Sequence, residues 1–117
     1  MGRLTTHVLD VARGRPAAGL AVTLYAADGE RRELTTAMTN SDGRCGSPLL
    51  EGGALKTGIY EMVFDTGAYF DRLGGLDLPE PKFLDEVVIR FGIADPEQHY
   101  HVPLLLSPFG YSTYRGS

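Results

Sequence analysis

Short runs of alternating apolar and polar residues, each ended by a turn-forming residue, recur along most of this 117-residue chain. Alternation with period two is typical of β-strands that bury one face. The 15 glycines and 7 prolines provide frequent turns, which disfavours long helices. The pattern therefore predicts an all-β fold built from short strands rather than a helical bundle.

The alternating segments divide the chain into strands separated by turns. The seven clearest cover residues 4–10, 20–26, 31–39, 59–64, 85–94, 99–106 and 111–115. About eight strands with this spacing suggest an antiparallel sandwich of two sheets. One segment is predicted to be a short helix, because Thr66 can cap it, Tyr69, Phe70 and Leu73 recur at helical spacing, and Gly74 can end it.

Composition limits the partners that the chain can bind. The 11 Lys and Arg residues against 15 Asp and Glu residues give a formal charge of −4 at pH 7, whereas a nucleic-acid backbone binder needs a basic excess. The apolar run 102–106 is far shorter than the roughly 20 residues of a membrane helix. We therefore expect a single domain spanning residues 1–117, with neither nucleic acid nor membrane as a partner.

Cys45 is the single cysteine of the sequence. One thiol cannot form a disulfide within the chain, and it provides neither a thiolate zinc site nor a redox pair. The first residues contain no apolar core of a secretion signal. Both observations predict a reducing compartment, the cytoplasm.

All three histidines are predicted on outer sheet faces. Alternate residues from Tyr100 to Leu106 are apolar, so His99 and His101 point the other way. His7 likewise alternates with the apolar residues of its own strand. Imidazoles have pKa values near neutrality and are suited to proton transfer. Two alternatives remain open at this point: solvated histidines without a role, and a metal site at His99 and His101, which would need a third ligand.

Two further charges stand near predicted strand ends. Arg44 follows the turn residues Asp42 and Gly43, which places a permanent cation there. The β-propensive sequence continues to the last residue, Ser117, which implies a terminal carboxylate held in place rather than a fraying tail. A fixed carboxylate can orient a histidine or bind a donor on a ligand.

The final 19 residues, HYHVPLLLSPFGYSTYRGS, resemble the C-terminal signature of the 5-hydroxyisourate hydrolases, the transthyretin-related enzymes of urate breakdown. The terminal Tyr-Arg-Gly-Ser is the diagnostic part. The resemblance continues at residues 4–10, 39–44 and 60–69, and thus spans essentially the whole chain.

This resemblance implies a prealbumin/transthyretin-like sandwich of two four-stranded sheets with one short helix. It also implies a homotetramer, a dimer of dimers, with substrate pockets in a channel between the dimers. The family's site residues fall on His7, Arg44, His101, Tyr114, Arg115 and Ser117 of this sequence.

The implied reaction opens the ring of 5-hydroxyisourate with water and gives 2-oxo-4-hydroxy-4-carboxy-5-ureidoimidazoline. In this scheme His101 is the general base, His7 orients groups or exchanges protons, and Arg44 offsets negative charge. Tyr114 and Arg115 contact the substrate, the Ser117 carboxylate holds a histidine tautomer, and no cofactor is required. The alternatives are a transthyretin-like carrier of small molecules and a metal-binding or purely structural sandwich.

Overall fold

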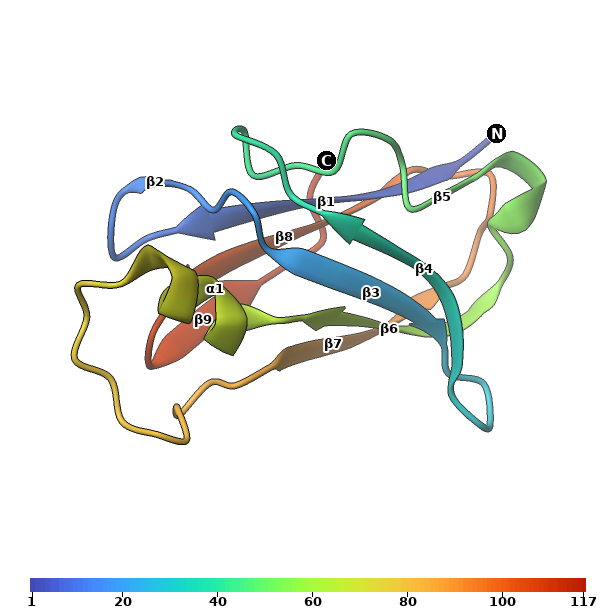
Figure 1. Ribbon diagram of the computed structural model, residues 1–117. Helices are drawn as coiled ribbons and strands as arrows, with labels where there is room; N and C mark the ends of the chain where they lie inside the picture. Colours follow the sequence, from blue (N-terminus) through green and yellow to red (C-terminus); the bar gives the residue numbers. More distant parts are fainter.

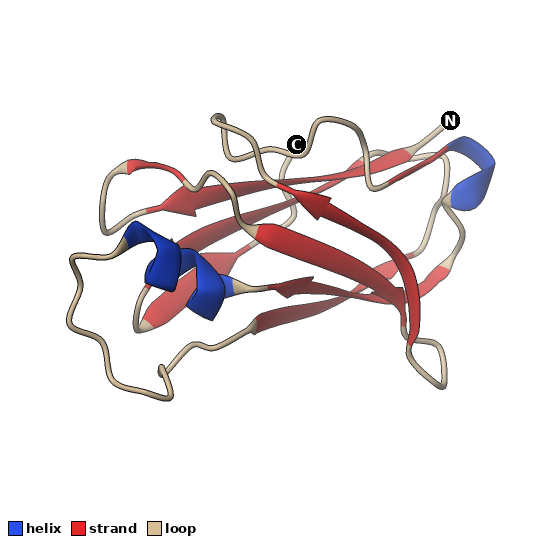
Figure 2. Ribbon diagram, viewed as in Figure 1, coloured by secondary structure: helices blue, strands red, loops and turns tan.

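The computed structural model describes residues 1–117 as two β-sheets packed face to face, with one short α-helix at an end of the sandwich and a single 3-10 turn, η1 (Gly52–Ala54) (Figures 1 and 2). The first sheet contains β1 (Arg3–Asp10), β2 (Arg15–Pro16), β5 (Leu50–Glu51), β8 (Tyr100–Ser107) and β9 (Gly110–Thr113). The second contains β3 (Ala21–Ala26), β4 (Arg32–Met38), β6 (Gly58–Phe64) and β7 (Val87–Ile93). No helix is long and apolar enough to cross a lipid bilayer.

The core lies between the inner faces of the two sheets. Its largest fully buried side chains come from both of them: Leu4, Val8, Leu104 and Leu106 from the first sheet, and Val22, Leu24, Met62, Phe64, Val87 and Ile93 from the second. Leu104 and Leu106 belong to the face of residues 100–106 that the alternation assigned to the core, so this assignment and the all-β prediction are confirmed.

The expectation of wholly antiparallel pairing is wrong at the centre of the first sheet. There β1 and β8 run parallel, from Leu4 opposite Tyr100 to Asp10 opposite Leu106. Parallel neighbours need a long connection, and here the whole second sheet separates the two strands in sequence. This pairing places residues from the beginning of the chain beside residues from its end.

The first sheet also has more strands than the expected four, because the free edge of β1 pairs with two short strands. β2 lies opposite Leu9 and Asp10, and β5 lies opposite Arg3 and Leu4. Two residues are too few to show an alternating pattern. Between these two pairings, His7 forms an isolated bridge with Arg44. The turn after β4 therefore lies against the middle of the β1 edge.

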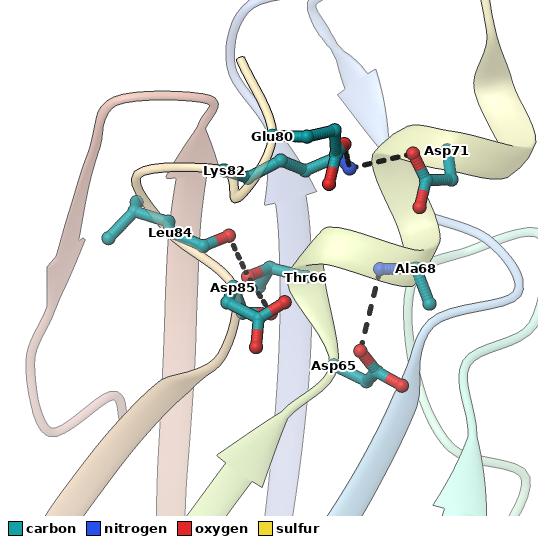
Figure 3. A network of polar contacts seen from close by, with 8 residues as sticks. All are labelled: Asp65, Thr66, Ala68, Asp71, Glu80, Lys82, Leu84 and Asp85. Atoms are coloured by element: carbon teal, nitrogen blue, oxygen red, sulfur yellow. Dashed lines mark hydrogen bonds and ion pairs between the residues drawn. The ribbon is translucent and has the colours of Figure 1, made fainter. Parts of the chain in front are cut away.

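The helix α1 (Thr66–Leu73) starts one residue earlier than expected (Figure 3). Asp65, not Thr66, is the N-cap, and its Oδ1 accepts a hydrogen bond from the Ala68 N–H at 3.4 Å. The Thr66 hydroxyl instead donates to the Leu84 and Asp85 carbonyls, which fastens the loop before β7. Gly74 ends the helix as expected, with its N–H bonded to the Phe70 carbonyl.

Two polar contacts hold α1 in place. The Lys82 ammonium lies between the carboxylates of Asp71 and Glu80, and so links the helix to the following loop (Figure 3). On the buried side, the Tyr69 hydroxyl donates to the fully buried Asp10 carboxylate at 2.7 Å. Burial and this carboxylate raise the pKa of Tyr69 to about 12. The end of β1 is thereby tied to the helix.

Candidate active site

A crevice of about 630 Å³ opens on the outer face of the first sheet. It is lined by residues from β1, from β8, from the segment after β4 and from the C-terminal tail: Arg3, Thr5, Thr6, His7, Leu9, Arg44, Cys45, Ser47, His99, His101, Pro103, Leu105, Tyr114, Gly116 and Ser117. Figure 1 shows the C-terminus beside the segment that follows β4. Four stretches that are distant in sequence therefore form one site.

The register of β1 and β8 brings the two central histidines together. Thr5 lies opposite His101, and His7 lies opposite Pro103, two residues further along. Both imidazoles point away from the core, because their neighbours in each strand are buried. Their ring centroids are 6.3 Å apart. A small planar molecule in the crevice can thus contact both rings.

The turn after β4 positions Arg44 beside His7. The Asn40 side chain organises this turn, since its Oδ1 accepts from the N–H groups of Asp42 and Arg44. Gly43 has φ +74°, and a Cβ atom there would lie 2.3 Å from the Val8 carbonyl oxygen. Because Gly43 approaches β1 so closely, its carbonyl accepts from the Val8 N–H at 2.8 Å and sets the Arg44 backbone alongside the strand.

The C-terminal tail continues the register of β9 along β8. Leu104 lies opposite Thr113, and the same register places Gly116 opposite His101, where the Gly116 N–H donates to the His101 carbonyl at 2.7 Å. Tyr114 and Ser117 line the crevice as the resemblance implied.

Arg115 is the one site residue named by the resemblance that does not line the crevice. Its guanidinium lies 4.1 Å from the ring centroid of Tyr100 and donates to the Gln98 side chain and the His99 carbonyl, each at 3.0 Å. Within one chain, Arg115 therefore holds the tail against the start of β8 rather than facing the space occupied by Arg44 and the histidines.

The crevice is electropositive, although the protein as a whole is acidic. Arg3 and Arg44 line it without a single Asp or Glu side chain, so two positive charges stand against the one negative charge of the C-terminal carboxylate. Burial lowers the pKa of His101, and the charges of Arg44 and His7 lower it further. Burial and Arg44 also lower the pKa of His7, against an opposing effect of Asp42. Both imidazoles are therefore neutral near pH 7 and able to accept a proton.

Other chemistries have less support from the lining residues. Burial raises the pKa of the Cys45 thiol, which keeps it protonated and a poor nucleophile. No three His, Cys, Asp or Glu side chains are grouped so that they could hold a metal ion. His99 and His101 thus lack the third ligand that a metal site would need.

Sequence reasoning did not single out Thr5, Arg3, Ser47 or Gly116. For Thr5 and Arg3 a signal was present, because they alternate with buried residues in the same way as His7 and so lie on the same face of the strand. Ser47 lies in an irregular segment without periodicity, and nothing local marks it.

Comparison with known proteins gives the family. A model of the HIUase/Transthyretin family matches residues 4–116. This chain belongs to that family. Among members of the HIUase/Transthyretin family, the chain is 62% identical to the 5-hydroxyisourate hydrolase 2 of Rhizobium meliloti (strain 1021), and the alignment covers 99% of this chain and 97% of the relative.

Solved structures agree with this assignment to the HIUase/Transthyretin family. The Klebsiella pneumoniae 5-hydroxyisourate hydrolase superposes with a TM-score of 0.82 at 35% identity, over 100% of both chains. An (S)-allantoin synthase superposes with a TM-score of 0.92 at 43% identity, over 99% of this chain and 44% of that protein. The chain thus spans less than half the length of the synthase and the full length of the Klebsiella enzyme.

Proposed function

We propose that this protein hydrolyses 5-hydroxyisourate to 2-oxo-4-hydroxy-4-carboxy-5-ureidoimidazoline. The observation that carries the proposal is the crevice, which joins two neutral imidazoles to a guanidinium and to the last residue of the chain. The 62% identity to a 5-hydroxyisourate hydrolase over nearly the whole length of both chains gives further support. A planar, oxygen-rich heterocycle suits an electropositive site of this size.

In the proposed reaction, His101 accepts a proton from water as the oxygen attacks a ring carbonyl carbon. A C–O bond forms, the adjoining ring C–N bond breaks, and the departing nitrogen takes the proton back from the imidazolium. The product carries a new N–H and a new carboxyl group, which ionises to the carboxylate by releasing the second proton of the water to solvent. The His7 ring lies 6.3 Å from the His101 ring on the neighbouring strand, where it can orient the substrate or exchange protons with it. The scheme uses no metal or organic cofactor.

The remaining groups bind the substrate and stabilise the transition state. Arg44 provides a fixed positive charge for the oxygen that becomes negative in the transition state. Tyr114 offers a ring and a hydroxyl to the substrate, and the Ser117 carboxylate can hold a histidine tautomer. Arg115 supports the site indirectly, because its contacts with Gln98, His99 and Tyr100 fix the tail that carries Ser117.

We also propose a homotetramer, a dimer of dimers, in which facing crevices form a channel. The strands β7 and β9 are unpaired sheet edges, and an apolar hollow lies between them and contacts both. Edges of this kind pair readily with another copy of the same chain. Phe109 and Tyr111 are large apolar side chains that are 58% and 45% exposed in the single chain. We therefore assign the contact between dimers to residues 107–114. Gel filtration with light scattering should give the mass of four chains.

A cytoplasmic location is part of the same proposal. The only cysteine, Cys45, is unpaired, which suits a reducing compartment. Fluorescence microscopy of a fusion protein tests the assignment.

The activity can be tested by stopped-flow ultraviolet spectroscopy. Urate oxidase generates the unstable substrate, and the decay of its absorbance is followed with and without the protein. We expect a clear acceleration that is proportional to the protein concentration. Decay at the spontaneous rate in the presence of folded protein would refute the proposed activity.

The tail offers a second test. Deletion of residues 115–117 should lower kcat/KM by about tenfold to a hundredfold, because a charged hydrogen-bonding group and the contacts that fix it are lost. A tag joined to Ser117 should have a similar effect, since it converts the carboxylate to an amide. The matched control is the same tag at the N-terminus. Full activity of the C-terminally tagged protein would exclude a role for the carboxylate.

A further inference from the structure

The Thr5 hydroxyl makes a contact that the proposed reaction does not yet use. Its Oγ1 lies 2.8 Å from Nδ1 of His101, although the two residues are 96 positions apart in sequence. The parallel register sets them directly opposite one another on the crevice side of the sheet. The other ring nitrogen, Nε2, has no hydrogen-bond partner in the protein.

The neighbouring threonine shows that this contact is not needed to join the strands. Thr6 points into the core, and its hydroxyl donates to the Val102 carbonyl at 2.7 Å, a buried bond between β1 and β8. The Thr5 hydroxyl bonds only to the imidazole. A threonine is therefore present on each face of the same strand, one holding the sheet and one facing a catalytic ring.

The opposite side of the His101 ring is closed by the tail. A Cβ atom on Gly116 would lie 2.6 Å from Cδ2 and 3.3 Å from Cγ of the ring. Such close approach leaves the ring no room to turn toward the tail. The imidazole thus lies between the Thr5 hydroxyl and Gly116.

We propose that Thr5 is a positioning residue that accepts the Nδ1–H of His101 and thereby keeps Nε2 free of a proton and available to activate water. The inference rests on the proposed function, in which His101 is the base. A neutral imidazole carries one proton, so a hydroxyl that accepts at Nδ1 selects the tautomer with a basic Nε2. When Nε2 gains a proton, Nδ1–H continues to donate to the same oxygen, and no group has to reorient.

At His101, a hydroxyl suits this task better than a carboxylate. A carboxylate at Nδ1 would raise the pKa of His101 and oppose the effects of burial and Arg44. The Thr5 oxygen is uncharged, so it selects the tautomer while the imidazole stays neutral.

The test compares Thr5→Val, which keeps the shape but loses the hydroxyl, with Thr5→Ser, which restores the hydroxyl. We expect Thr5→Val to lower kcat by about tenfold to a hundredfold with little change in KM, and Thr5→Ser to recover most of the loss. Thr23→Val is the matched control, because Thr23 makes a cross-strand hydroxyl contact with Thr36 in the other sheet. It should retain the wild-type kcat.

The tautomer itself can be measured without substrate. In ¹⁵N-labelled protein, long-range ¹H–¹⁵N spectra should show Nδ1 of His101 protonated in wild type and in Thr5→Ser, and a mixture of tautomers in Thr5→Val. Wild-type protein protonated at Nε2, or a Thr5→Val variant with wild-type kcat, would overturn the inference. If the tautomers are as expected but 5-hydroxyisourate is not hydrolysed, the proposed function fails and the positioning role of Thr5 stands.

Discussion

Replacing His101 with alanine should lower kcat/KM for 5-hydroxyisourate by about 10²–10⁴, the range that a general base contributes. The side chain lies on the crevice face of β8, while its neighbours Tyr100 and Val102 supply the core contacts. Removal of the ring should therefore leave the sandwich and its assembly intact. Stopped-flow kinetics on the purified variant measures the loss.

Two controls separate this catalytic loss from a structural one. Circular dichroism and gel filtration of the His101→Ala variant should match wild type. Free imidazole added to the assay should restore part of the rate, because the cavity left by the ring can admit a base. A monomeric or unfolded variant, or one with full activity, would contradict the proposed role.

The second large effect is expected at Arg44. Arg44→Met should lower kcat/KM by about 10²–10³, comparable to the loss of an oxyanion-stabilising group. It should also change the pH dependence, because the Arg44 charge lowers the pKa of both His7 and His101. Without that charge both pKa values rise. The imidazoles are then protonated at a higher pH, and activity is lost sooner as the pH falls.

The measurement is kcat/KM from about pH 5 to about pH 8, the range in which histidine titrates. The acid limb of the profile should move to higher pH in Arg44→Met and stay near its wild-type position in Arg44→Lys, which keeps the charge. Arg44→Lys should still be slower than wild type, because an ammonium lacks the planar fork of the guanidinium. An acid limb that moves to lower pH in Arg44→Met would refute this electrostatic coupling.

Alternation in the sequence was sufficient to predict the seven longer strands. It could not predict which strands are neighbours, because parallel and antiparallel strands have the same period. The parallel pairing of β1 with β8 was therefore missed, and so were the two-residue strands β2 and β5. At α1, Asp65 and Thr66 are both good caps, and only the tertiary contact of Thr66 with Leu84 and Asp85 decides between them.

For the site, the alternation correctly predicted that the His7 and His101 side chains point away from the core. The family resemblance is confirmed by the match over residues 4–116. The partner of each histidine depends on register, which no local pattern contains, and Thr5 was missed for that reason. The same alternation argument could have predicted the position of Arg115. Alternation continued through the tail puts it on the face opposite Tyr114 and Gly116, where the structure has it.

The parallel pair β1–β8 also affects how the protein is made. β1 is synthesised well before its neighbour β8, which starts at Tyr100, so the growing chain carries the unpaired β8-facing edge of β1 through all the residues between them. Contacts between residues this far apart form late and slowly. A chain terminated before Tyr100 has His7 and Arg44 but lacks His101 and the tail, so β8 and the residues after it must be made before any turnover can begin.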